Sequence, residues 1–382
     1  MRASVHVTAQ VWCQGEVWRS ESYPQPVHGI AISRAQGSLG DVGVVSWDGT
    51  CSLLRAQDAQ AQGPAYQPVW SVSPGKGLYS VAFGTVSHGG TGGGPGSVLG
   101  VCSMDQRCYV LDGRDGTVLY TFSGHEDEVN SLHFQPSAAG GAETLVASVS
   151  DDTLCLVWAP AAGKSDCLAR LEGHSQAVYG VRFHPIHPSL LATVGFDHVG
   201  KIWDLRTGQA ELEVVGHTDD VIGVDFSPNG MLLATGSDDY TCRIWDLRKL
   251  GSNGNAADAH AAGAGRNHLF CLQHEDDVKR LEWSPCGAQL ATASANGSAS
   301  VWQMPSLKPS HDVRRSRTLD DGAAPTLARS LQGHADTVFD VAWVPRHSAA
   351  YEQGARLLSA SHDNTVRAWG TANALKVPAG DI

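Results

Sequence analysis

The chain has 382 residues, of which 42% are hydrophobic and only 17% charged, and its formal net charge is −12. This apolar content suffices for a large core and excludes global disorder, while the acidic balance argues against bulk-charge binding of nucleic acid or anionic membranes. Nine scattered cysteines without a C-x-x-C pair indicate reduced thiols, and no signal-peptide or membrane-spanning stretch is apparent. We therefore expect an intracellular protein, cytoplasmic or nuclear, without membrane insertion.

The first predicted element is a strand over residues 5–12. In this segment Val5, Val7, Ala9 and Val11 alternate with other side chains, which is the period of two of a β-strand. No segment of the chain carries a sustained apolar stripe at the helical period, so a helical solenoid is excluded.

An internal repeat organises the rest of the chain. Residues 173–206 (GHSQAVYGVRFHPIHPSLLATVGFDHVGKIWDLR) and 216–248 (GHTDDVIGVDFSPNGMLLATGSDDYTCRIWDLR) share a Gly-His start, an alternating strand, a turn and two further short β runs. Their histidines, His174 and His217, are 43 positions apart, within the period of a four-stranded propeller blade. Similar but weaker copies lie on both sides, which gives seven in all.

On these repeats the chain resembles the WD-repeat (WD40) β-propellers over about residues 27–371. The resemblance implies an all-β fold, a single seven-bladed propeller of four-stranded antiparallel blades over residues 1–371, followed by a tail at 372–382. The repeats are expected at about 27–55, 77–112, 124–159, 173–206, 216–248, 273–303 and 333–370. We expect the strand at 5–12 to close the ring as the outer strand of the last blade; the alternative is the shorter segment 374–377, which Pro378 interrupts.

Four stretches interrupt the repeats and differ from them in composition. They are rich in Gly or Ala, or carry mixed Arg and Asp, and we interpret them as surface loops between blades and not as separate domains. These loops are predicted at residues 57–68, 88–97, 250–267 and 305–326.

The resemblance also implies a buried network of His, Ser or Thr, Asp and Trp that ties each blade together. In such a network the histidine and the aspartate are structural, because removing one buried partner leaves another without a hydrogen bond. Carried onto this chain, the four complete sets are His125, Ser148, Asp152 and Trp158; His174, Thr193, Asp197 and Trp203; His217, Thr235, Asp239 and Trp245; and His334, Ser359, Asp363 and Trp369.

Three repeats depart from this pattern. The sixth has Asn296 in place of the aspartate, beside His274, Thr292 and Trp302. The first two keep the turn aspartates Asp48 and Asp105 but have Leu54 and Leu111 instead of tryptophan and lack the Gly-His pair. We expect incomplete networks in these three blades.

Similar propellers bind partners mostly on the narrow top face around the central channel, where two positions of each blade point. One position follows the first apolar residue of the inner strand: His28, Tyr79, Asn130, Tyr179, Ile222, Lys279 and Phe339. The other precedes the turn aspartate: Trp47, Met104, Asp151, Phe196, Asp238, Ala295 and His362.

From these we predict eight partner-binding residues: Trp47, Tyr79, Met104, Asp151, Tyr179, Phe196, Asp238 and Phe339. The aromatic groups are typical of binding hot spots, and the aspartates favour a partner segment with Lys or Arg. The competing interpretation is that several of these side chains are buried between blades.

The two strongest repeats both end in Trp-Asp-Leu-Arg, at 203–206 and 245–248. These segments are similar to the box by which some WD-repeat proteins dock on the adaptor of cullin-type ubiquitin ligases, with Arg206 and Arg248 as the contact residues. The same ending occurs in propellers without a ligase role, including splicing-factor propellers. The alternative is that each arginine pairs with a neighbouring aspartate, an interaction worth little when exposed.

The sequence carries no catalytic, cofactor or metal motif that we could assign. Gly163-Lys164-Ser165 lacks the upstream glycine of a phosphate-binding loop, and His184 with His187 is a weak metal signal without further ligands. We expect a non-enzymatic scaffold within a multiprotein complex, without a small-molecule substrate. The alternatives are a substrate receptor of a cullin-type ligase and a subunit of a splicing, ciliary or trafficking assembly. An enzyme would need three or more carboxylates or histidines at the channel mouth outside the blade networks.

Overall fold

The computed structural model describes residues 16–20, 23–34, 40–56, 66–86, 96–136, 144–160, 167–250, 268–305, 324–346, 348, 351 and 355–370. Within these residues the chain forms a succession of short strands and one helical turn. The strands are β1 (Glu16–Arg19), β2 (Val27–Ile32), β3 (Val42–Ser46), β4 (Cys51–Ala56), β5 (Tyr66–Val72), β6 (Leu78–Val86), β7 (Gly96–Ser103), β8 (Arg107–Asp112), β9 (Val118–Ser123), β10 (Val129–Phe134), β11 (Val146–Ser150), β12 (Cys155–Trp158), β13 (Ala169–Leu171), β14 (Val178–Phe183), β15 (Leu190–Gly195), β16 (Val199–Asp204), β17 (Gln209–Val215), β18 (Val221–Phe226), β19 (Leu232–Ser237), β20 (Thr241–Asp246), β21 (Phe270–Gln273), β22 (Val278–Trp283), β23 (Gln289–Ser294), β24 (Ser298–Gln303), β25 (Thr326–Gln332), β26 (Val338–Trp343), β27 (Ala355–Ser361) and β28 (Val366–Gly370).

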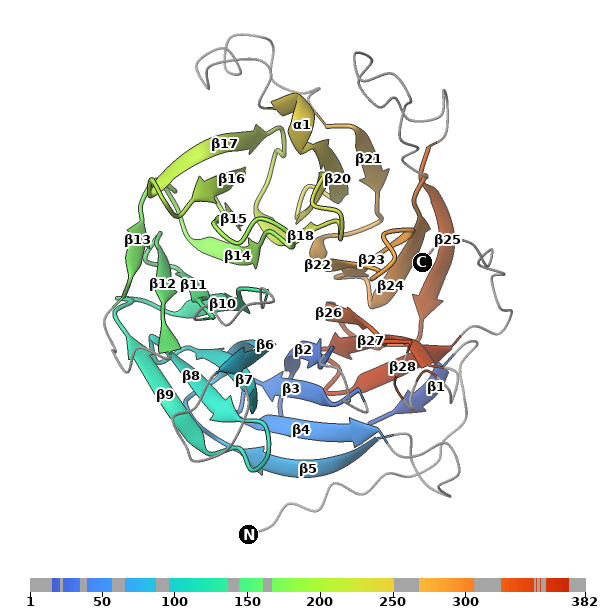
Figure 1. Cartoon of the computed structure of the whole chain (residues 1–382). Helices are drawn as coiled ribbons and strands as arrows, with labels where there is room; N and C mark the ends of the chain where they lie inside the picture. The colour runs from blue at the N-terminus through green and yellow to red at the C-terminus, as the bar shows by residue number, and fades with distance from the viewer. Residues whose placement is uncertain are drawn as a thin grey trace.

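The strands pair into seven antiparallel sheets of four strands each. Six of them take their strands in sequence order, from β2–β5 to β22–β25, and the seventh has the order β1-β28-β27-β26. We number the sheets as blades 1 to 7 in this order. Figure 1 shows them arranged in a ring, with β2, β6, β10, β14, β18, β22 and β26 nearest the centre. The prediction of an all-β, seven-bladed propeller is confirmed.

An N-terminal strand supplies the fourth strand of blade 7. β1 pairs antiparallel with β28, with Trp18 opposite Ala368 and Arg19 opposite Arg367, and Ser20 then donates its backbone N–H to the Val366 carbonyl at 2.8 Å. The strand in this position is therefore 16–19. The predicted closing strand at 5–12 and its alternative at 374–377 both lie outside the described residues.

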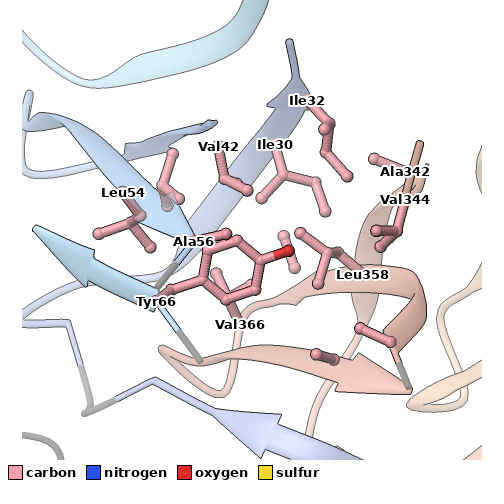
Figure 2. Packing of buried hydrophobic residues seen from close by; sticks show 14 of the residues in the cluster. Ile30, Ile32, Val42, Leu54, Ala56, Tyr66, Ala342, Val344, Leu358 and Val366 are labelled. Atoms are coloured by element: carbon pink, nitrogen blue, oxygen red, sulfur yellow. The ribbon is translucent and has the colours of Figure 1, made fainter. Parts of the chain in front are cut away.

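Apolar side chains fill the spaces between neighbouring blades. Because the second strand of a blade is covered on both faces, strands such as β3 and β11 are continuously buried, whereas the outer strands β5, β17 and β25 are mostly exposed. Figure 2 shows the packing between the first and last blades, where Ile30, Val42 and Tyr66 meet Leu358 and Val366. Residues from both ends of the chain thus share one core.

Three predicted loops end earlier than expected. β5 begins at Tyr66, β7 at Gly96 and β25 at Thr326, so the last residues of the loops predicted at 57–68, 88–97 and 305–326 belong to strands. The helical turn α1 (Leu247–Leu250) was not predicted and leads into the loop at 250–267. The strands that flank the four loops belong to one blade in each case, namely β4 and β5, β6 and β7, β20 and β21, and β24 and β25, so the prediction that these loops lie between blades is wrong. Most of these four loops and the tail at 372–382 lie outside the described residues. No helix in the described part of the chain is long and apolar enough to cross a membrane.

Candidate functional site

One end of the ring, the top face, gathers the loops that lead into the inner strands and the tight turns that follow the second strands. In every blade, the residue before the turn aspartate (Asn296 in blade 6) donates its backbone N–H to the carbonyl of the residue before the inner strand, at 2.9 to 3.1 Å. The pairs are Trp47 with Pro26, Met104 with Gly77, Asp151 with Glu128, Phe196 with Ala177, Asp238 with Asp220, Ala295 with Asp277 and His362 with Thr337. The predicted contact residues therefore start from equivalent backbone positions.

Five rings from blades 7, 1 and 2 form an aromatic cluster on this face: His28, Trp47, Tyr79, Phe339 and His362. His28 lies at the centre, with its ring centroid 3.6 Å from that of Phe339, 5.1 Å from Tyr79 and 5.4 Å from Trp47. His28 Nδ1 also lies 3.3 Å from His362 Nε2. Burial lowers the pKa of His28, and the neighbouring His362 adds to this effect. The neutral imidazole of His28 therefore belongs to the packed interior of the cluster.

The side chains of this part of the top face differ in their exposure to solvent. Trp47 is 40% exposed and Met104 beside it 39%, so both can meet a partner. Phe339 is only 6% exposed, because His28 and His362 both pack on its ring. The alternative of burial between blades thus describes Phe339, and it also describes Ile222, which is buried in blade 5.

A second pair of rings lies in blade 4. Tyr179 and Phe196 are stacked, with centroids 4.5 Å apart and planes 10° from parallel, and both are partly exposed. Offset or parallel aromatic pairs of this kind hold each other in place. They present a firm apolar edge on the far side of the channel from Trp47.

Carboxylates on blades 3, 5 and 6, on either side of the aromatic pair of blade 4, form what we call the acidic arc: Glu128, Asp151, Asp220, Asp238 and Asp277. Its members have close polar neighbours. Tyr79 donates to Glu128 at 2.6 Å, Asn130 donates to Asp151 at 2.6 Å, and Lys279 donates to Asp238 at 2.9 Å and to Asp277 at 2.7 Å. The arc joins the aromatic cluster through the first of these bonds.

Burial, with neighbouring negative charges, raises the pKa values of two carboxylates of the arc, Asp151 and Asp238. Burial raises the pKa of Asp151, and the charges of Asp127 and Glu128 add to it. Burial also raises the pKa of Asp238 to about 6, even though Lys279 opposes this shift. Carboxylates that resist ionisation in this way are stabilised by an added positive charge.

Sequence reasoning missed Glu128, Asp220 and Asp277. Each is the last residue of a Gly-His or Gln-His loop, and the segments Glu-Asp-Glu, Thr-Asp-Asp and Glu-Asp-Asp were visible at the same place in three repeats. The top face therefore carries more carboxylates than predicted. Their number meets the requirement for an enzyme given above, which was three or more carboxylates or histidines at the channel mouth outside the blade networks.

The predicted blade networks are brought together in four blades. In blade 3, His125 Nδ1 lies 2.8 Å from Asp152, its Nε2 lies 2.8 Å from Ser148 Oγ, and Trp158 Nε1 donates to that same oxygen at 2.9 Å. A carboxylate only accepts, so Nδ1 carries the proton and Nε2 accepts from the hydroxyl. Blades 4, 5 and 7 repeat this chain through His174, His217 and His334 with distances of 2.7 to 2.8 Å.

These histidine and aspartate pairs are built for stability. Burial raises the pKa of Asp239, but the hydrogen bond and the electrostatic attraction from His217, with further hydrogen bonds from Thr241 and the Thr218 N–H, outweigh it, so the net pKa lies well below the usual range. The pKa values of Asp152, Asp197 and Asp363 are lowered in the same way. With both imidazole nitrogens engaged, none of these histidines is poised to transfer a proton to a substrate.

The network of blade 6 is incomplete. Trp302 Nε1 still donates to Thr292, at 3.3 Å, but His274 Nε2 is buried without a hydrogen-bond partner. Asn296 instead accepts from the backbone and hydroxyl of Ser298. Burial lowers the pKa of His274 to about 4, which keeps this imidazole neutral.

The two Trp-Asp-Leu-Arg endings place each arginine on the aspartate two residues before it. Arg206 donates to Asp204 through Nε at 3.0 Å, and Arg248 donates to Asp246 at 2.8 and 2.6 Å. This is the pairing that the structural alternative implied. The two differ in access, because the side chain of Arg206 is 75% exposed and that of Arg248 32%.

His184 and His187 form a structural turn. His184 Nδ1 accepts the backbone N–H groups of Ile186 and His187, and its Nε2 lies 3.1 Å from the Gly230 carbonyl. Both ring nitrogens of His184 are engaged in hydrogen bonds, which leaves this histidine no lone pair for a metal ion.

Comparison with known proteins agrees with the repeat. The family described as "WD domain, G-beta repeat" matches residues 116–159, 165–204, 208–246, 266–303 and 325–370, together more than half of the chain. Similar proteins include the "Nuclear distribution protein PAC1" of Arthroderma benhamiae (32% identical over 52% of this chain and 37% of that protein), the "Guanine nucleotide-binding protein subunit beta" of Zea mays (27%, over 55% and 58%) and the "Pre-mRNA-processing factor 19 homolog 2" of Arabidopsis thaliana (27%, over 55% and 44%). The matched part is less than two thirds of each relative's own length. The chain belongs to the WD-repeat (WD40) family.

Proposed function

We propose that this propeller is a non-catalytic scaffold that binds partner proteins on its top face, within a multiprotein complex. The observation that carries the proposal is that the aromatic cluster and the acidic arc adjoin on one face around the channel. Exposed aromatic groups supply the buried anchors of interfaces. The acidic arc adds selectivity for a partner with positive charge.

The partner segment is one that carries Lys or Arg next to an apolar side chain. An apolar group packs on Trp47 and Met104, and a cation extends over Asp151 and Asp238. An ammonium or guanidinium group above Trp47 also gains from the ring itself. The relatives' names refer to different processes, so they do not favour one complex over another.

The test is selection of binding peptides from a displayed random library with the purified full chain. We expect peptides enriched in Lys or Arg adjacent to Leu, Phe or Trp. Their binding should fall at least about tenfold in Trp47→Ala and in the double variant Asp151→Asn/Asp238→Asn. Glu211→Gln, an exposed change on outer strand β17, is the matched control. Peptides that bind all variants equally contradict the proposal.

A second candidate is docking on the adaptor of a cullin-type ubiquitin ligase. It is favoured by the exposure of Arg206, whose guanidinium is available to a partner even while paired with Asp204. Binding of the purified adaptor to the chain, lost in Arg206→Ala and retained in Trp47→Ala, supports this candidate. Absence of adaptor binding to the unmodified chain rejects it.

The number of carboxylates keeps an enzymatic use of the top face as the competing function. We favour binding because Asp238 and Asp277 are both held by Lys279, and Glu128 is held by Tyr79. The hydrogen bond from Lys279 lowers the basicity of Asp238, which a general base needs. Turnover of any substrate that Asp238→Asn abolishes would reverse this preference.

A further inference from the structure

The third residue of each inner strand differs in kind between the blades. Five blades carry only glycine or serine there, namely Gly29, Ser80, Ser131, Gly180 and Gly223, while blades 6 and 7 carry Arg280 and Asp340. Arg280 is 5% exposed and reaches across the ring to blade 3. There its guanidinium donates to Ser131 Oγ at 3.3 Å and to the Asn130 carbonyl at 3.4 Å. Figure 1 shows β22 and β10 on opposite sides of the centre.

A cavity of about 590 Å³ lies on the side of Arg280 away from the top face. Its lining includes Arg280 but none of the second-position residues of the top face, such as Tyr79 and Lys279. The cavity, which we call the lower chamber, opens between the loops that follow the inner strands, among them Gln135-Pro136 and Pro285.

The two sides of the lower chamber differ in chemistry. The fifth residue of the inner strand is alanine in blades 1, 2 and 7, at Ala31, Ala82 and Ala342. In blades 3 to 6 it is polar or charged: His133, Arg182, Asp225 and Glu282. The short alanine side chains on one side leave room for the cavity, and the opposite wall supplies its polar groups.

The carboxylates of this chamber are satisfied by the fold. Asp340 accepts the backbone N–H groups of Ile30 and Val341 at 3.1 and 2.9 Å. Asp225 accepts from the Trp283 N–H at 2.8 Å. Glu282 accepts from the Trp343 N–H at 2.6 Å and pairs with Arg34.

The two arginines of the lower chamber, Arg280 and Arg182, have few hydrogen-bond acceptors. Arg280 has no carboxylate within ion-pair distance among the described residues, its two hydrogen bonds are long, and its Nε is buried without an acceptor. Arg182 forms an ion pair with Asp225, with 3.7 Å between Nε and Oδ1, and among the described residues its side chain donates a hydrogen bond only to the Val181 carbonyl beside it. A guanidinium has five N–H groups in a planar fork that matches a carboxylate or a phosphate.

We propose that the lower chamber binds a small organic anion, whose carboxylate or phosphate accepts hydrogen bonds from Arg280 and Arg182 while its apolar part lies on the alanine wall. The anion supplies the acceptors that two confined guanidinium groups lack. The ligand is small, because its polar head and its apolar part must both fit in this volume. This site lies at the other end of the channel from the proposed protein-binding face and departs from the sequence-based expectation that the chain has no small-molecule ligand.

The test is isothermal titration calorimetry of the full chain in chloride buffer of constant ionic strength. One series uses inorganic phosphate and the other sodium butyrate. We expect saturable binding of at least one anion, weakened at least about tenfold in Arg280→Gln. Arg206→Gln is the matched control, because that arginine is exposed and lies outside the chamber. Binding of butyrate alone identifies a carboxylate ligand, and binding of phosphate alone a phosphorylated one.

Two further variants keep the test decisive if Arg280→Gln does not fold. Arg182→Gln removes the less buried of the two guanidinium groups and is expected to weaken both anions. Ala31→Leu fills the apolar wall and is expected to weaken butyrate more than phosphate. Absence of saturable binding of both anions to the unmodified chain overturns the proposal. Binding that Arg280→Gln and Arg182→Gln leave unchanged overturns it as well.

Discussion

The backbone N–H of Ile30 in the first blade donates to the carboxylate of Asp340 in the last blade, at 3.1 Å and across 310 positions of the sequence. The same relationship recurs between other neighbouring blades. Asp225 accepts the N–H of Trp283, and Glu282 accepts that of Trp343. An inner-strand side chain thus satisfies a backbone donor of the next blade, and at the seam this bond joins the two ends of the chain.

Asp340→Ala is expected to destabilise the ring at its seam. The change leaves the N–H groups of Ile30 and Val341 without their acceptor in a buried place, at a cost of about 1–3 kcal/mol. Urea denaturation followed by tryptophan fluorescence measures the loss. Glu211→Ala on the exposed outer strand β17 should leave the midpoint unchanged. If the urea midpoint of Asp340→Ala equals that of the unmodified chain, the hydrogen bond at the seam does not contribute to stability.

Asn296→Asp is expected to stabilise blade 6. A carboxylate at this turn can accept from His274, as Asp239 does from His217 at 2.8 Å in blade 5, and a net gain of about 0.5–1.5 kcal/mol follows. The pKa of His274, now about 4, should rise because the new charge favours the imidazolium. The gain should disappear as the pH falls below about 4, where the carboxylate becomes protonated in the unfolded chain.

Thermal denaturation near neutral pH and an NMR titration of the His274 ring check these two effects. The matched control is Asp239→Asn, which introduces in blade 5 the defect that blade 6 already has. It should lower the melting temperature. If Asn296→Asp lowers it too, the turn of blade 6 is adapted to asparagine and to its bonds with Ser298.

The repeated features of the fold were predictable from the sequence because each one recurs at a fixed spacing. His174, Thr193, Asp197 and Trp203 meet within one blade, so their contacts depend only on local geometry that neighbouring repeats share. The reach of Arg280 to Ser131 was not predictable, because it joins opposite blades of the ring and occurs once. The sequence left open which of the top-face side chains are buried, and it could not single out Phe339 for a similar reason, since His28 covers it from the far end of the sequence.

Trp47 and Phe339 were predicted to have the same role, and the structure separates them. Phe339→Ala removes a buried ring and is expected to cost about 3 kcal/mol of stability, whereas Trp47→Ala removes an exposed ring and is expected to change stability much less. Partner binding should show the reverse order at a temperature where both variants are folded. Paired measurements of melting temperature and peptide affinity check this, and a Trp47→Ala protein that binds as tightly as the unmodified chain contradicts it.

Affinity for a basic partner peptide is expected to fall in mildly acidic solution. Burial raises the pKa of Asp238 to about 6, so this carboxylate is charged near neutral pH and becomes protonated as the pH drops through that value. A bound Lys or Arg stabilises the charged form, which means that binding releases a proton and weakens as the proton concentration rises. Asp238→Asn removes the titrating group, so the affinity of this variant should be lower near neutral pH and should vary less between about pH 5 and 7.5.

Fluorescence anisotropy of a labelled peptide measures the pH dependence of affinity for both proteins, and Glu211→Gln serves as the control outside the top face. If the Asp238→Asn curve keeps the full pH dependence of the unmodified chain, another group of the arc controls binding, and Asp151, whose pKa is also raised by burial, is the next residue to replace.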